Sequence, residues 1–299
     1  MSVTDTILDK PKQPAERSRT KEIWRNLRRS PSGMIGLTIL VIQLSIALIS
    51  PAIAPYNPIK IDSSSLMQPP SNEHIFGTDS FGRDIFSRVL TGGRIALVIT
   101  TTAGILAITW GGLLGIMIGF LGGAIDDVIM RIVDALLSFP SLFIYLLIIS
   151  IFGSSNIVLV LVLSITNGIS IIRIARGASL SFIARDFITA ARARGERTAT
   201  VVIRELLPNV RDVLLVEFAM RWSWMLLYFS SLSFLGFGVT PPTPDWGLMI
   251  AENRSRLAIA PWGSIFPMIA LGLLVIGINL AADALAKAMG LDRSLEAQL

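Results

Sequence analysis

Few side chains of this chain could perform catalytic chemistry. Its 299 residues include a single histidine, His74, and no cysteine, which excludes a thiol nucleophile, a Cys-ligated zinc or iron–sulfur site and a multi-histidine metal site within the chain. No lysine follows a glycine, so the loop whose lysine contacts nucleotide phosphates is absent. We therefore expect this chain to carry no catalytic residue, no metal and no cofactor of its own.

Two charged side chains stand four residues apart in an otherwise apolar stretch. Glu217 and Arg221 would lie on one face of a helix, where this spacing allows them to pair. A charge at the bilayer centre costs about 2.5–3.5 kcal/mol, so the pair is either structural or lines a polar pathway. Trp222, Trp224 and Tyr228 follow on the same stretch. They could line a pathway that accepts varied side chains, or face lipid or a partner subunit.

The elements around these residues are those of a membrane protein. Hydrophobic residues make up 52% of the chain and charged residues only 16%, whereas soluble domains carry about a quarter charged residues; the mean hydropathy is +0.66. A membrane-spanning helix needs about 20 mostly apolar residues. Six segments meet this length: 33–54, 95–121, 132–152, 157–174, 213–235 and 264–285. The sequence predicts an all-α polytopic membrane protein with six transmembrane helices, none of them interrupted, and without internal repeats.

Basic residues predict the orientation of these spans. Segment 10–29 is rich in Lys and Arg, and segment 176–211 carries seven arginines; loops with such an excess stay in the cytoplasm. We expect a cytoplasmic N-terminal arm over 1–32 and, after the first transmembrane helix at 33–54, an external segment over 55–94. A five-helix core over 95–285 contains the cytoplasmic loop 176–211 and an external loop at 236–262, and 286–299 forms a cytoplasmic tail. The net charge of +5 reflects these loops, so we expect no nucleic-acid partner.

The most specific stretch is 187–209, FITAARARGERTATVVIRELLPN. It predicts a short helix over 188–194 that Gly195 ends as a C-terminal cap. A second helix follows over 200–206 and is closed by Pro208. Small residues on a helix face permit the close approach of another surface, and the arginines around them add docking charge.

This stretch resembles the EAA loop of the membrane subunits of ABC importers, whose pattern is E-A-A, three residues, Gly, nine residues and I-x-L-P. The matching residues are Ala190, Ala191, Gly195, Leu207 and Pro208. Thr189 replaces the glutamate of the pattern and Glu205 replaces its isoleucine. The resemblance implies a coupling element that sits in a groove of a separate ATPase subunit.

Three further stretches resemble the C-type membrane subunit of the dipeptide/oligopeptide (and nickel) ABC permease family. They are FGTDSFGRDIFSR at 76–88, LSFLGFGVTPPTPDWG at 232–247, and Pro261-Trp262. The residues of the first motif that we single out are Gly77, Thr78, Asp79, Gly82, Arg83 and Asp84. They form either a turn and helix cap in which Arg83 pairs with a carboxylate, or a surface that receives substrate or the binding protein.

The resemblance, over roughly residues 20–290, implies a permease like those of type I ABC importers. Such a subunit translocates short peptides across the bacterial cytoplasmic membrane by alternating access, with both termini cytoplasmic. It implies a homologous second permease subunit, two ATPase subunits that bind ATP and Mg, an external solute-binding protein, a peptide substrate and the lipid bilayer as partners. Nickel or another small solute is the alternative cargo, and an ATP-independent secondary transporter is the alternative class.

Overall fold

The computed structural model describes residues 16–291, and all regular elements in that range are helical, which confirms the predicted all-α class. The expectations for residues 1–15 and 292–299, which include the start of the basic arm and most of the tail, lie outside the described residues. Five helices are long and apolar enough to cross a membrane. They are α2 (Pro31–Ile53), α3 (Ile85–Leu121), α6 (Asn156–Ile183), the continuous stretch Thr198–Phe234 that ends in α9 (Leu207–Phe234), and α11 (Trp262–Ala288).

The segment predicted as the third span, 132–152, is not a single straight helix. α4 (Gly123–Leu137) and α5 (Ser141–Phe152) pass the same test only together and meet at 84°, so the uninterrupted helix predicted over 132–152 is wrong. Pro140 lacks a backbone N–H and disfavours the helical conformation of Phe139 before it. The chain therefore leaves the helix after Leu137 and starts a new one at Ser141.

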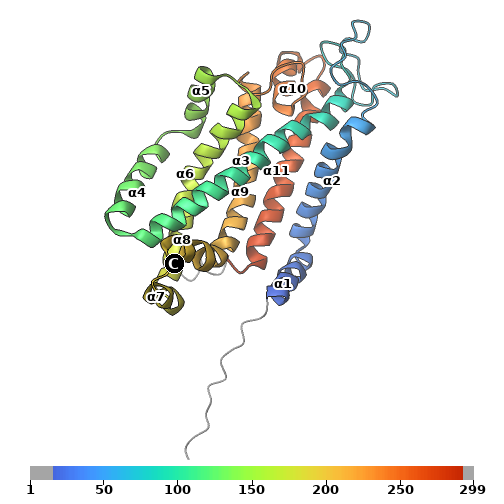
Figure 1. Ribbon diagram of the computed structural model, residues 1–299. Helices are drawn as coiled ribbons and strands as arrows, with labels where there is room; N and C mark the ends of the chain where they lie inside the picture. The colour runs from blue at the N-terminus through green and yellow to red at the C-terminus, as the bar shows by residue number, and fades with distance from the viewer. Residues whose placement is uncertain (1–15, 292–299) are drawn as a thin grey trace, which may run out of the picture.

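The short elements gather at the two ends of the bundle (Figure 1). α10 (Trp246–Asn253), the 3-10 turn η2 (Arg254–Arg256) and the irregular segment 54–84 lie at one end, which we call the α10 end. At the other, the α7 end, lie α1 (Glu16–Arg29), α7 (Asp186–Ala193) and α8 (Thr198–Thr200), which leads through a π-helical turn, η1 (Val201–Leu206), into α9. α2 and the α4–α5 pair occupy opposite sides of the bundle.

Glycine allows α3 and α6 to approach backbone to backbone. A Cβ placed on Gly111 would lie 2.5 Å from the Gly168 carbonyl oxygen, and one on Gly115 would lie 2.4 Å from that of Ile172. Small residues four apart are the usual means by which membrane helices pack this closely. α3 and α6 thus pack backbone against backbone along this contact.

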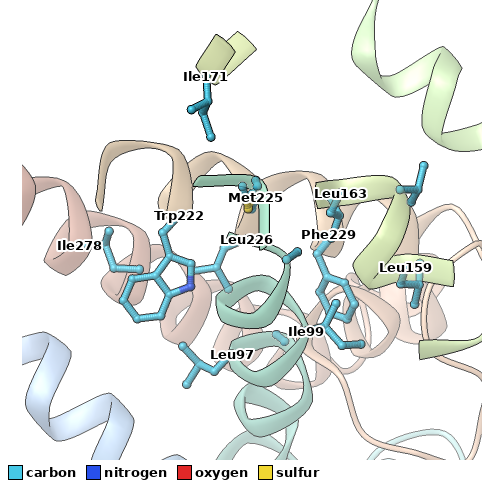
Figure 2. Packing of buried hydrophobic residues seen from close by; sticks show 14 of the residues in the cluster. Leu97, Ile99, Leu159, Leu163, Ile171, Trp222, Met225, Leu226, Phe229 and Ile278 are labelled. Atoms are coloured by element: carbon cyan, nitrogen blue, oxygen red, sulfur yellow. The ribbon is translucent and has the colours of Figure 1, made fainter. Parts of the chain in front are cut away.

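The apolar core lies where α3, α6, α9 and α11 meet (Figure 2). Its members include Leu97, Ile99, Leu159, Leu163, Trp222, Met225, Leu226, Phe229 and Ile278. The Trp222 side chain is 8% exposed, and its indole N–H donates to the Thr100 hydroxyl over 3.1 Å. Trp222 therefore packs in the core of this chain.

Candidate functional site

α7 is a short helix with one buried and one exposed face. Ile188 and Ala191, three positions apart, have no exposed surface, whereas Thr189 and Ala190 are exposed. Because residues three and four apart share a helix face, the buried pair anchors α7 to the bundle. The exposed alanine remains available to another surface.

Gly195 ends α7 as the sequence predicts. Its φ is +71°, its N–H donates to the Arg192 carbonyl over 2.9 Å, and the N–H of Glu196 donates to the Ala191 carbonyl over 3.2 Å. These two bonds and the left-handed glycine make a Schellman motif, which satisfies the last carbonyls of the helix. The Gly195 Cα faces open space, since a Cβ there would meet nothing within 4 Å.

The predicted end of the second helix at Pro208 is wrong. α8, η1 and α9 run on without a stop, and Leu207 and Pro208 occupy the first positions of α9. Proline is tolerated in the first turn of a helix because the N–H that it lacks has no partner there. Leu207 is half-buried and Pro208 exposed, so both lie at the base of a long helix.

Two contacts tie the α7 region to the membrane helices. The Arg192 guanidinium donates to the Phe120 carbonyl over 3.1 Å and lies 4.2 Å from the centre of the Phe120 ring, at the end of α3. Val201 and Leu206 of η1 are fully buried in the core. A displacement of α7 would therefore act on α3 directly and on α9 through η1.

A polar pocket of about 300 Å³ opens between α5, α6 and α9. Its polar lining includes Ser141, Tyr145, Asn167, Ser170, Arg221 and Tyr228. The Asn167 amide donates to the Tyr145 hydroxyl over 3.2 Å, and the rings of Tyr145 and Tyr228 meet edge to face at 5.2 Å. Trp224, 59% exposed, also lines the pocket. The pocket thus joins aromatic walls to hydroxyl, amide and guanidinium groups.

The predicted pairing on α9 is present, because Arg221 donates through Nε to the Glu217 carboxylate. Of the five α9 residues singled out from the sequence, Arg221, Trp224 and Tyr228 line the pocket. Glu217 supports Arg221 from one turn below, and Trp222 is turned into the core.

A larger hollow, about 680 Å³, lies between α3 and α9. Its lining is apolar apart from Thr101, Thr109 and Arg211. Because a ligand site needs several convergent polar groups to orient a solute, the smaller α5–α6–α9 pocket is the better candidate.

The 77–84 motif and α10 form a closed polar cap at the α10 end. Arg83 donates to Asp79 over 2.7 Å and to Glu252 of α10 over 2.5 Å. Arg88, which has no exposed surface, donates to Glu252 over 3.2 Å and to the Pro58 carbonyl over 3.0 Å. These buried ion pairs hold segment 54–84, the start of α3 and α10 together, although Arg88 Nε itself has no hydrogen-bond partner among the described residues.

The remaining residues of the motif shape the turn and the helix start. Asp84 caps α3 by accepting from the Ser87 N–H over 2.8 Å, and its other oxygen lies 2.9 Å from His74 Nδ1. The Trp262 indole donates to the Thr78 carbonyl over 3.0 Å. Gly77 and Gly82 have φ of +74° and +71°. This arrangement matches the first of the two alternatives that the sequence left open, a turn and helix cap in which Arg83 pairs with a carboxylate.

Asp245 begins α10 from a fully buried position. Its carboxylate accepts from the Leu248 N–H over 3.1 Å. Burial raises the pKa of Asp245 to about 6, although the Leu248 hydrogen bond and the positive charge of Arg88 act in the opposite direction. The cap therefore contains one carboxyl that titrates in a mildly acidic medium.

Comparison with known proteins identifies the fold and the family. Residues 111–292 match the model of the binding-protein-dependent transport system inner membrane component, and residues 18–70 match the N-terminal TM domain of oligopeptide transport permease C. The chain belongs to this permease family. The resemblance stated from the sequence motifs is thereby confirmed, and the bent helical bundle is that of a multi-pass transport permease subunit.

Curated relatives of this permease cover almost its whole length. The dipeptide transport system permease protein DppC of Alkalihalophilus pseudofirmus is 33% identical over 269 residues, which are 90% of this chain and 88% of that protein. The glutathione transport system permease protein GsiD of Shigella dysenteriae serotype 1 is 36% identical over 273 residues, which are 90% of this chain and 89% of the relative.

Sequence reasoning did not single out Arg88, Glu252 or Tyr145, which the permease brings to partners in other elements. Arg88 and Glu252 pair in the cap although 164 positions separate them, and Tyr145 joins Asn167 across α5 and α6. An arginine at the start of an apolar helix was the available signal for Arg88. Its partner on α10 carried no local signal, because the contact exists only in the folded chain.

Proposed function

We propose that this chain is the membrane-spanning subunit of an ATP-binding-cassette importer that moves short peptides across the bacterial cytoplasmic membrane. The observation that carries the proposal is the family match over 111–292, which includes the exposed, Schellman-capped α7. The cargo is inferred from the relatives, one named for dipeptide and the other for glutathione transport. Glutathione is itself a tripeptide, so peptides are favoured over nickel.

The α7 end faces the cytoplasm in this proposal. The seven arginines of 176–211 and the basic N-terminal arm favour that side, and both termini would then be cytoplasmic. The α10 end, with its closed polar cap, faces outward. An external solute-binding protein would deliver its cargo there.

ATP and Mg²⁺ bind to two partner ATPase subunits, because this chain lacks the phosphate-binding loop. The exposed face of α7, around Ala190, docks into a groove of one ATPase subunit. When ATP closes the ATPase pair, α7 moves with it, and the Arg192–Phe120 contact and η1 carry the movement to α3 and α9. A homologous second permease completes the pathway, and the two halves alternate between inward-open and outward-open arrangements.

The rival class, a secondary transporter acting without ATP, predicts interrupted helices near the middle of the membrane. The α4–α5 break interrupts one apolar helix pair, so the presence of an interruption alone does not discriminate between the classes. The family match and the α7 segment favour the ATP-driven importer. Peptide uptake by this chain without an ATPase partner would reverse that preference.

The test is substitution of Gly195 in the assembled importer. Gly195→Leu places a side chain at φ +71° on the face that meets the ATPase, so we expect peptide uptake to fall about tenfold or more through loss of coupling. Insertion into the membrane should be unaffected, because a Cβ there meets no other atom of the chain. The measurements are initial uptake rate, ATPase activity and the amount of inserted protein.

Gly153→Leu is the matched control. Gly153 also has a positive φ, +82°, and open space around its Cα, but it lies at the α5–α6 turn at the other end of the bundle. Gly153 has φ 82° and ψ 171°, a region that is essentially closed to other residues, so its substitution imposes at least as much backbone strain without touching the ATPase face. Equal losses of uptake in both variants, or normal uptake by Gly195→Leu, would contradict the coupling role. Native mass spectrometry of the co-purified complex tests the partners.

A further inference from the structure

The pocket between α5, α6 and α9 contains an arginine that the chain leaves partly unsatisfied. Glu217 holds Arg221 through Nε, and within residues 16–291 no other group accepts a hydrogen bond from this guanidinium. A guanidinium has five N–H donors in a fixed fork. The two terminal nitrogens, Nη1 and Nη2, therefore keep four N–H groups for a ligand, while Glu217 fixes the plane of the fork.

An ionised arginine at the position of Arg221 costs free energy, and a bound anion would offset that cost. Arg221 lies near the middle of α9, and its side chain is 22% exposed. An ionised side chain at such a depth is rare and generally marks a pathway or a ligand site. The structural arginine of the cap, Arg88, differs in this respect, because a carboxylate and two backbone carbonyls accept from its two terminal nitrogens.

Other groups around the pocket also lack partners within the described chain. The hydroxyls of Ser141, Ser170 and Tyr228 line the pocket, and no hydrogen bond of theirs is found among residues 16–291. α5 begins at Ser141, so the positive end of its helix dipole adds to the potential of Arg221. The pocket thus gathers a positive charge and several hydrogen-bond donors at one point.

We propose that this pocket receives the C-terminal carboxylate of the peptide during translocation, with Arg221 as its bidentate partner. The proposal rests on the proposed function, which supplies a peptide as cargo. Two parallel N–H···O bonds from the end of an arginine fork match the geometry of a carboxylate. The hydroxyls of Ser170 and Tyr228 complete the site, and Trp224 and Tyr228 bound the side chain of the last residue without selecting it.

The size of the pocket agrees with this role. About 300 Å³ is at the lower end of small-molecule sites, roughly 300–1,000 Å³, and suits the final residue of a peptide better than a whole peptide. The rest of the cargo would lie toward the pathway between the two permeases. Such a site would contact the group that all linear peptides share, so it tolerates varied sequences.

The test compares a free acid with its amide in the complete importer. The probes are trialanine and trialanine amide, or another acid–amide pair that the binding protein retains in both forms. Uptake into proteoliposomes is measured at saturating loaded binding protein, with ATPase stimulation recorded in parallel. In Arg221→Gln we expect the acid-to-amide ratio of uptake rates to fall about tenfold, the effect of losing a charge-assisted pair.

The matched control is Arg173→Gln. Arg173 also pairs with a carboxylate within the membrane helices, Asp134 of α4, but it does not line the pocket. We expect the acid-to-amide ratio to stay at its wild-type value in this variant. The binding protein is the same in every arm, so a change in the ratio between variants reports on the permease.

Each outcome decides the proposal. Equal changes for acid and amide in Arg221→Gln, or no change, would overturn it. If Arg221→Gln does not assemble, Arg221→Lys and Tyr228→Phe must each lower the ratio, and an unchanged ratio in either assembled variant overturns the site. A wild-type complex that transports neither peptide but carries another solute refutes the peptide cargo, which is a different failure.

Discussion

The polar cap and the α7 region each contain a glycine with the same backbone angle in opposite surroundings. Gly82 in the cap and Gly195 after α7 both have φ of +71°. A Cβ on Gly82 would lie 1.8 Å from the Asp62 carbonyl oxygen, whereas a Cβ on Gly195 would meet nothing within 4 Å. Gly82 is therefore packed against its own chain in the cap, whereas Gly195 faces open space at the end of α7.

The charges of the two regions differ in the same way. In the cap, Arg83 and Arg88 are buried and bound to carboxylates of the same chain. Beyond α7, Arg194 pairs with Glu196, but its side chain is 59% exposed, and exposed pairs contribute little to stability. The charged groups of the cap are paired within this chain, while the groups around α7 are exposed and available to a partner protein.

The largest expected effect concerns the buried arginine of the cap. Arg88→Met would leave Glu252 and Asp79 without one of their cationic partners, and breaking a buried ion pair from one side costs about 3–5 kcal/mol. Thermal unfolding of the purified permease, together with proteolysis of segment 54–84, measures the loss. An Arg194→Met variant, altered at the exposed pair, should unfold close to the wild-type temperature. A stable Arg88→Met variant would contradict the view of the cap as a closed unit.

The two glycines provide the sharpest comparison. Gly82→Ala adds backbone strain of about 1–2 kcal/mol and a collision with Asp62 that overpacking data place at about 1–3 kcal/mol. Gly195→Ala adds the strain alone, so it should destabilise by only about 1–2 kcal/mol. Both variants are compared by thermal unfolding in one detergent. Equal losses of thermal stability would show that the cap accommodates an added Cβ as readily as the end of α7 does.

The smallest effect is a pH dependence of cap stability. The pKa of Asp245 is raised to about 6 in the folded chain, against about 4 when unfolded, so the folded state holds the proton more tightly. The stabilisation of the folded state by this raised pKa is fully present below pH 4 and is lost as the pH rises through 6. Between pH 5 and pH 8 the free energy of unfolding should fall by about 1 kcal/mol.

Asp245→Asn isolates this contribution, because the amide oxygen can still accept from the Leu248 N–H while the group no longer titrates. The difference in unfolding temperature between pH 5 and pH 8 should shrink relative to the wild type. An unchanged difference would assign the pH dependence to groups other than Asp245.

Much of the fold could be predicted from periodicity and composition alone. Apolar length located the spans, and the positive φ at Gly195 follows from a glycine placed after a short helix of small residues. The Pro140 break was missed because hydropathy averages over a kink, although the proline itself was visible. Pro208 was misread as a stop, because the same residue type is tolerated at the start of a helix.

In the candidate pocket, too, one feature could be predicted from the sequence and another could not. The spacing of Glu217 and Arg221 predicted their pairing, since four residues make about one helical turn. Which of the neighbouring aromatic residues joins them was not predictable. Trp222 and Trp224 are two positions apart and point in different directions, one to Thr100 in the core and the other to the pocket. Only the packing of α5 and α6 against α9 distinguishes them.

By itself, the sequence determined the properties that depend on neighbours along the chain. These are the apolar lengths, the missing phosphate loop, the motif that ends α7 and the helical spacing of paired charges. The tertiary structure alone decided which distant side chains meet: Arg88 with Glu252, and Tyr145 with Asn167. The physical reason is that a turn or a span is stabilised by local contacts, whereas a buried charge or a pocket requires groups from several helices to converge.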